Sequence, residues 1–173
     1  MTRTIAMIAV AGIAGSAFGQ GFALSASSNS VNVGDVVTIT MSFNNGAKVL
    51  SGGIFNFNAD SEIGSAAAGT WAQPGTFTIG GTPNGASLEG ARYLQAPNGN
   101  PTNGDVFTYA WTATAEGIVN IDLEGISVLE GDLGGFGGTA VQVAGRTTIE
   151  VVPTPASAAV LGLGGLAAAR RRR

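Results

Sequence analysis

The sequence predicts an all-β protein, an antiparallel β-sandwich, and three observations support this prediction. Apolar and polar side chains alternate over short stretches through the middle of the chain, as in strands with one face in water. Clusters of glycine, asparagine, aspartate and proline separate these stretches. No stretch of the middle region keeps a helical period over three turns. Two half-buried sheets stack into a sandwich, and closure into a barrel is the competing architecture.

The first 19 residues have the three-part layout of a secretory signal peptide. Arg3 supplies a positive start, and Ile5–Ala14 form a short apolar stretch. Ala17 and Gly19 stand where cleavage requires small side chains, which places the cut before Gln20. A single-pass anchor is the alternative, and the shortness of the apolar stretch disfavours it.

The expected strands follow in chain order. In the first, 37–43, four apolar residues alternate with threonine and serine. Segment 64–104 is expected to be a long loop region that carries one strand, 76–79. In the strand that follows, Phe107, Tyr109 and Trp111 are expected to share one buried face of a sheet. The remaining expected strands are 55–58, 119–124 and 147–151.

The chain ends in a proline-marked hinge, an apolar segment and a cluster of arginines. Pro153 and Pro155 keep the backbone extended around Thr154. Ala156–Ala169 carries no charge and can form a helix of 14 residues. Its length of roughly 21 Å is short of a hydrocarbon core of about 30 Å. The cluster that follows resists translocation and consists of Arg170, Arg171, Arg172 and Arg173. An Ala/Gly-rich segment is a poor permanent anchor; a weak permanent anchor or a terminal helix packed on the protein are the interpretations that the segment alone allows.

The order of hinge, apolar helix and arginine cluster in residues 153–173 resembles the PEP-CTERM sorting signal, which occurs on exported proteins of bacteria that make extracellular matrix. The central acidic residue of that motif is Thr154 here, as in the Pro-Thr-Pro variant of some lineages. The resemblance implies recognition by an exosortase, a membrane transpeptidase, and removal of the helix after export. Together with the N-terminal signal, it predicts a location at the cell surface or in the extracellular matrix.

The region between the two signals, 20–152, is long enough for one domain with a proper core. It holds Lys48, Arg92 and Arg146 against 11 acidic residues, which gives a net charge of −8. Nucleic-acid binding needs clustered lysine and arginine, so this balance argues against it. The chain has no cysteine and no histidine, which excludes disulfides, Ser-His-Asp and Cys-His catalysis and ordinary zinc sites.

Carboxylates are the side chains left for catalysis or metal binding. Asp122 and Glu124 lie on one face of one strand, about 7 Å apart, which resembles the separation in a glycosidase pair. A solvated strand face is the simpler interpretation. Two loops are candidate Ca²⁺ sites, because Ca²⁺ takes carboxylate and carbonyl oxygens; exposed turn acids are the alternative. These loops hold Asp60 with Glu62 and Glu130 with Asp132. No other cofactor is expected.

Segment 64–104 also carries the aromatic side chains Trp71 and Tyr93. Aromatic rings on a long loop of a rigid sandwich can stack on sugar faces, which makes these two residues a candidate carbohydrate site. The alternative is that both rings cap the open end of the core.

A second resemblance concerns the domain itself. Val33-Gly34-Asp35 opens a threonine-rich strand, and Ser51-Gly52-Gly53 leads into a strand with two phenylalanines. Further strands begin at Phe107 and at Gly117. Residues 24–152 thereby resemble the cohesin-type jelly-roll sandwich, a fold shared with many carbohydrate-binding modules. The resemblance implies the fold and, by analogy alone, a role in adhesion or binding.

These observations together predict an exported structural or interaction protein without catalysis of its own. The first alternative is a carbohydrate-binding module that uses Trp71 and Tyr93, and the second is a glycoside hydrolase that uses Asp122 and Glu124. The expected partners are the export machinery, an exosortase-type transpeptidase and extracellular polysaccharide.

Overall fold

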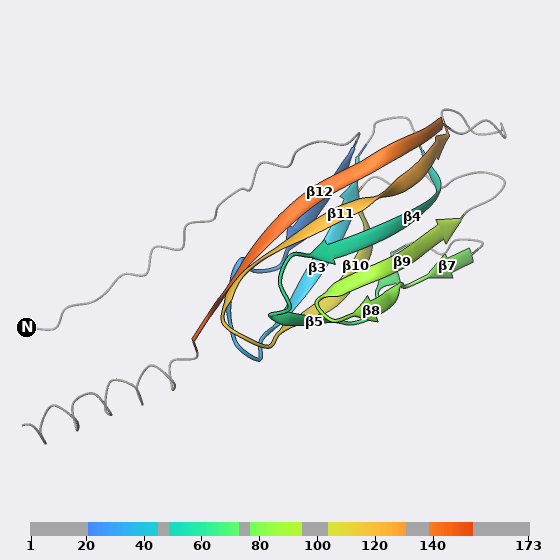
Figure 1. The fold of residues 1–173 in the computed structure, drawn as a ribbon. Helices are drawn as coiled ribbons and strands as arrows, with labels where there is room; N and C mark the ends of the chain where they lie inside the picture. The colour runs from blue at the N-terminus through green and yellow to red at the C-terminus, as the bar shows by residue number, and fades with distance from the viewer. Residues whose placement is uncertain (1–20, 45–48, 73–76, 95–103, 131–138, 154–173) are drawn as a thin grey trace, which may run out of the picture.

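The computed structural model describes residues 21–44, 49–72, 77–94, 104–130 and 139–153. These residues form an all-β sandwich, which confirms the predicted fold class (Figure 1). The strands are β1 (Phe22–Ala26), β2 (Ser30–Asn32), β3 (Val36–Phe43), β4 (Val49–Ala59), β5 (Gly64–Ala66), β6 (Thr70–Trp71), β7 (Phe77–Ile79), β8 (Thr82–Asn84), β9 (Ser87–Leu94), β10 (Gly104–Ala113), β11 (Gly117–Glu130) and β12 (Thr139–Val152).

Two sheets make up the sandwich. The five-stranded sheet has the order β1-β3-β10-β5, with β6 also beside β10. The seven-stranded sheet has the order β2-β12-β11-β4-β9-β7, with β8 also beside β9. The strand pairs are antiparallel, except that the short β2 runs parallel to β12. Because the described strands form two separate sheets, the architecture is a sandwich and not a closed barrel.

The core lies between the sheets and is rich in aromatic side chains. Phe107, Tyr109 and Trp111 of β10 are all buried on one face, as the alternation predicts. From the opposite sheet, Phe57 stacks on Phe107 with ring centroids 5.3 Å apart. Trp111 is fully buried, and Gly64 of β5 packs against its ring so closely that a Cβ at this position would overlap it. Burial of large rings is therefore a substantial part of what stabilises the sandwich, beside its many aliphatic side chains.

The prediction of a single strand in segment 64–104 is wrong. The described part of this segment contains β5, β6, β7, β8 and β9, and β9 lies inside the seven-stranded sheet between β4 and β7. Gly90 has a φ of +65°, and the register of β9 against β4 shifts beside it. Leu88 and Ala91, three residues apart, both become buried. This bulge breaks the period of two, so the alternation that marks a strand is lost from the sequence.

The N-terminal signal and residues 154–173 of the C-terminal signal lie outside the described residues, which end at Pro153 directly after β12. The predicted cleavage site and the predicted sorting segment therefore stay predictions. Within the described residues, no helix has the length and apolar character that crossing a membrane requires.

Candidate functional site

The outer face of the seven-stranded sheet is divided along its strands into two parts of opposite character. The polar half lies toward the start of β11 and the end of β12, and the apolar half lies further along β11 and across β4, β9 and β7. The polar half consists of Asn58, Asp60, Asn120, Asp122, Glu124, Arg146 and Thr148. The apolar half consists of Ile54, Phe77, Ile79, Leu94 and Ile126, with Arg92 among them.

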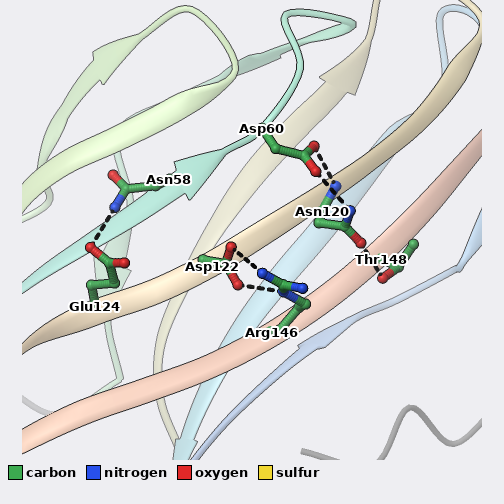
Figure 2. A network of polar contacts seen from close by, with 7 residues as sticks. All are labelled: Asn58, Asp60, Asn120, Asp122, Glu124, Arg146 and Thr148. Carbon is green, nitrogen blue, oxygen red and sulfur yellow. Dashed lines mark hydrogen bonds and ion pairs between the residues drawn. The ribbon is translucent and has the colours of Figure 1, made fainter. Parts of the chain in front are cut away.

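In the polar half, a first group of side chains is centred on Asn120 of β11 (Figure 2). The backbone N–H of Asn120 donates to Asp60 Oδ1 over 2.8 Å, and its Nδ2 donates to Asp60 Oδ2 over 2.7 Å. Thr148 Oγ1 donates to the Asn120 side-chain oxygen over 2.7 Å. These hydrogen bonds favour the ionised carboxylate, the side-chain bond from Asn120 most, and lower the pKa of Asp60.

A second group pairs charges across strands β11, β12 and β4 (Figure 2). Arg146 donates from Nε to Asp122 Oδ1 over 2.6 Å and from Nη2 to Asp122 Oδ2 over 2.8 Å, so the pair is bidentate. Asn58 Nδ2 donates to Glu124 Oε2 over 3.0 Å. The hydrogen bond and the negative charge of Asp122 raise the pKa of Arg146. Each charged side chain of the polar half therefore has a partner on a neighbouring strand or loop.

The apolar half follows from the strand register. Ile126 of β11 lies opposite Ile54 of β4, and Leu94 of β9 lies opposite Phe77 of β7. Ile79 of β7 stands in the same row as Ile54, with one residue of β9 between them. These five side chains expose between 38% and 51% of their surface. The strand register places them together on one sheet face, and a cluster of exposed apolar side chains is a feature that marks interaction surfaces in soluble proteins.

One charged residue lies within the apolar half. Arg92 of β9 has Ile54 as its cross-strand partner on one side and Ile79 on the other. Leu94 follows two residues later on the same face, and Gly90 precedes it. Among the described residues, Arg92 is exposed and has no ion pair.

The candidate catalytic pair lies within the polar half. Asp122 and Glu124 do share one face of β11, as predicted, but Asp122 is bound to Arg146 and Glu124 to Asn58. Both carboxylates stand on the open outer face of the sheet. This is the arrangement of a solvated strand face, because a glycosidase pair flanks the bond that it cleaves.

Of the four candidate Ca²⁺ ligands, the structure describes the side chains of Asp60 and Glu62, and both accept hydrogen bonds from within the protein. Both carboxylate oxygens of Asp60 accept hydrogen bonds from Asn120. Glu62 accepts from the backbone N–H of Ala86 over 3.2 Å, in the turn between β8 and β9. The side chain of Glu130 and the whole of Asp132 lie outside the described part of the chain. In that described part, no three acidic side chains come close enough to hold a metal ion.

The two candidate sugar-stacking rings take part in the core. Trp71 and Tyr93 have ring centroids 5.0 Å apart, and Trp71 also lies 4.8 Å from Phe107. The indole N–H of Trp71 donates to the backbone oxygen of Ile79 over 3.0 Å. Because Tyr93 is only 3% exposed, the two rings do not form an open stacking surface. Both rings pack against the aromatic side chains of the core.

Sequence reasoning missed the apolar half, although the sequence contains a signal for it. Two large apolar residues stand next to each other in Ile54-Phe55 and in Tyr93-Leu94. Neighbouring residues of a strand point to opposite faces, so in a sheet with one buried face one member of each pair is exposed. Ile54 and Leu94 are these exposed members.

The similarity of this chain to known proteins is a similarity of fold. No family model and no curated protein matches the chain. A cohesin module from a family 33 glycoside hydrolase of Clostridium perfringens has a TM-score of 0.59 at 11% identity and covers 79% of this chain and 100% of its own. The fold is cohesin-like. The third ScaB cohesin of R. flavefaciens, solved with a group 1 dockerin, has a TM-score of 0.54 at 17% identity and covers 79% of this chain and 97% of its own.

A chain of a type I cohesin–dockerin complex from Clostridium thermocellum has a TM-score of 0.53 at 15% identity, covering 76% of this chain and 99% of its own. At these identities the likeness concerns the cohesin-like fold. It confirms the fold that the strand patterns suggested.

Proposed function

We propose that this chain is an exported surface or matrix protein whose sandwich binds another protein without catalysis, through the apolar half of the seven-stranded sheet. The observation that carries the proposal is the apolar half itself. Fully burying one such side chain is worth about 1.5–3 kcal/mol. Five that remain about half exposed therefore leave roughly 5 kcal/mol of apolar burial open to a partner.

Protein is a better match than carbohydrate for this surface. The aromatic platforms that bind sugars need an open ring face, and Tyr93 is buried while Trp71 packs between Phe55 and Phe107. Two of the structurally similar cohesins are parts of complexes with dockerins. A protein partner for the present chain is in keeping with those complexes. The candidate catalytic carboxylates Asp122 and Glu124 are instead bound to Arg146 and Asn58.

The route to the surface is the second part of the proposal. The N-terminal signal directs export with cleavage before Gln20, and the Pro153-Thr154-Pro155 hinge with its arginine-ended helix directs sorting by an exosortase-type enzyme. Mass spectrometry of the mature protein tests this part. We expect a start at Gln20 and loss of everything beyond Pro155; an intact Arg173 end on the surface protein would leave a plain anchor instead.

The binding part is tested with matched variants on the same sheet face. The double variant Ile54→Gln with Leu94→Gln makes the apolar half polar without adding charge. Ala144→Gln places the same side chain at an exposed position of β12, outside both halves. Immobilised wild type and both variants are exposed to solubilised surface and matrix proteins, and the retained proteins are quantified by mass spectrometry.

We expect one protein to be retained by the wild type and by the Ala144→Gln variant, and to fall about ten-fold or more on the double variant, since hot-spot truncations commonly exceed 1–2 kcal/mol. Purified, this protein should bind the wild type in calorimetry. Equal retention on all three chains would contradict the proposal.

A further inference from the structure

The outer face of the seven-stranded sheet carries two arginines in opposite situations. Arg146 gives two hydrogen bonds to Asp122 and is neutralised within the sheet. Arg92 has Ile54 and Ile79 as its cross-strand partners and Leu94 two residues away on its own strand. Among the described residues it has no acidic partner, although the protein is strongly acidic.

This difference has a consequence for any molecule that covers the apolar half. Such a molecule removes water from Ile54, Ile79 and Leu94, and Arg92 stands in the midst of them. A guanidinium that loses water without gaining an acceptor is strongly unfavourable. A carboxylate is the acceptor that matches its planar donors in a bidentate way. A partner that buries this surface must therefore bring an acceptor to Arg92.

We infer that the partner of this face is a protein segment that presents one carboxylate surrounded by apolar side chains, and that Arg92 binds this carboxylate while the apolar half binds the surrounding side chains. The inference rests on the proposed function and names the chemistry of its partner. Arg92 acts here as the residue that selects the partner, because an apolar segment without the carboxylate leaves the guanidinium unpaired.

Acidic residues at the border of the apolar half limit how many acidic residues the partner can carry. Glu124 of β11 and Glu89 of β9 are both exposed, and their described partners are the uncharged amides of Asn58 and Asn84. Neither amide offsets the negative charge of the carboxylate that it binds, so both positions repel further acids on the partner. The complementary segment therefore has its acid in the centre and neutral or basic residues at its edge.

An acidic polysaccharide also offers carboxylates, but it lacks the apolar side chains that would cover Ile54, Phe77 and Ile126. The exposed apolar surface thus favours a protein segment over a uronic-acid polymer. The two ligands are separable in experiment, because only the protein segment depends on both the charge and the apolar side chains.

The test selects ligands without knowledge of the natural partner. A phage-displayed random peptide library is panned on the secreted wild-type protein, on the Arg92→Glu variant and on the Arg146→Gln variant, with folding of each checked by circular dichroism and melting temperature. We expect the wild type and Arg146→Gln to enrich peptides with one aspartate or glutamate flanked by leucine, isoleucine or phenylalanine. Arg92→Glu should enrich lysine or arginine at that position.

Binding of one selected peptide then gives the size of the effect. Arg92→Gln should weaken it at least about thirty-fold, the loss measured when one member of a buried charge pair is removed. The peptide affinity of Arg92→Lys should lie between those of the wild type and Arg92→Gln, because lysine keeps the charge but loses the bidentate geometry. Arg146→Gln should change affinity less than about three-fold, since substitutions outside the contact area have small effects.

The outcomes separate this inference from the proposed function. The selected peptides could show no enrichment of aspartate or glutamate and yet bind the double variant Ile54→Gln with Leu94→Gln less tightly than the wild type. That result would overturn the inference and leave the proposed function standing. Selected peptides insensitive to that double variant would overturn both. Alginate, a uronic-acid polymer, is tested in parallel: binding that needs Arg92 but survives the double variant would identify a carbohydrate ligand and overturn the inference.

Discussion

The polar and apolar halves of one sheet face share strands β4 and β11, yet they differ in whether their side chains are satisfied within the protein. In the polar half each charged side chain has a hydrogen-bonding partner, as between Asp122 and Arg146 or between Asp60 and Asn120. In the apolar half the side chains meet water, and Arg92 has no acidic partner among the described residues. The charged groups of the polar half are paired within the protein, whereas the apolar side chains and Arg92 of the apolar half are left to interact with water.

The strand β11 shows how little sequence separates the two halves. Asp122, Glu124 and Ile126 follow one another at every second position on its outer face. The backbone pairing with β4 continues through all three residues without a break. The change from charged to apolar surface is thus made by side-chain chemistry alone, on a continuously paired strand.

The largest expected effect concerns the core that supports both halves. Trp111→Ala should lower the free energy of unfolding by about 3–5 kcal/mol, because it removes a large, fully buried ring. Urea unfolding measures this loss. Ile126→Gln on the outer face, where the side chain is half exposed, serves as the control and should lose no more than about 1 kcal/mol. A loss under about 1 kcal/mol for Trp111→Ala would mean that the core does not depend on this ring.

A second prediction concerns the apolar half in the absence of a partner. Its half-exposed side chains should hold the protein on a hydrophobic-interaction column. Ile54→Gln with Leu94→Gln should elute clearly earlier while circular dichroism shows the same fold, and Ala144→Gln should elute with the wild type. Identical elution of all three chains would show that these side chains do not act as one apolar surface.

A smaller effect is expected from acid, and it belongs to the polar half. Hydrogen bonds from Asn120 lower the pKa of Asp60 below its ordinary value. Its ionised form therefore stabilises the fold above the unfolded pKa of about 3.9, and this contribution is lost as the pH falls through the lower folded value. Asp60→Asn should thus lower the urea midpoint at neutral pH more than at about pH 3. An equal difference in urea midpoint between wild type and Asp60→Asn at both pH values would contradict the lowered pKa of Asp60.

The smallest effect is expected from the ion pair. Asp122→Asn removes the acid opposite Arg146, but the Arg146 side chain is 62% exposed, so the pair is screened by water and salt. Calorimetry should show no resolvable change in melting temperature, and partner binding should be retained. A clear fall in partner binding would extend the binding surface into the polar half.

The sequence predicted the sandwich and its inner face well, because strict alternation in β3 and β10 reports which side of a strand is buried. It did not predict β9, since the bulge at Gly90 breaks the alternation between Leu88 and Ala91. The apolar half was missed for a related reason. Its residues come from β4, β7, β9 and β11, and only the register of these strands brings Ile54, Leu94 and Ile126 onto one surface.

The exposed isoleucines of the sheet face provide the most direct test of its role in binding. Ile54, Ile79 and Ile126 lie in the apolar half, and Ile118 lies at the other end of β11, where it is 62% exposed. Isoleucine δ1-methyl NMR is recorded on the labelled protein while the partner protein from the capture experiment is added. The account predicts that the signals of Ile54, Ile79 and Ile126 shift or broaden and that Ile118 stays in place. A response of Ile118 with the other three unchanged would contradict it.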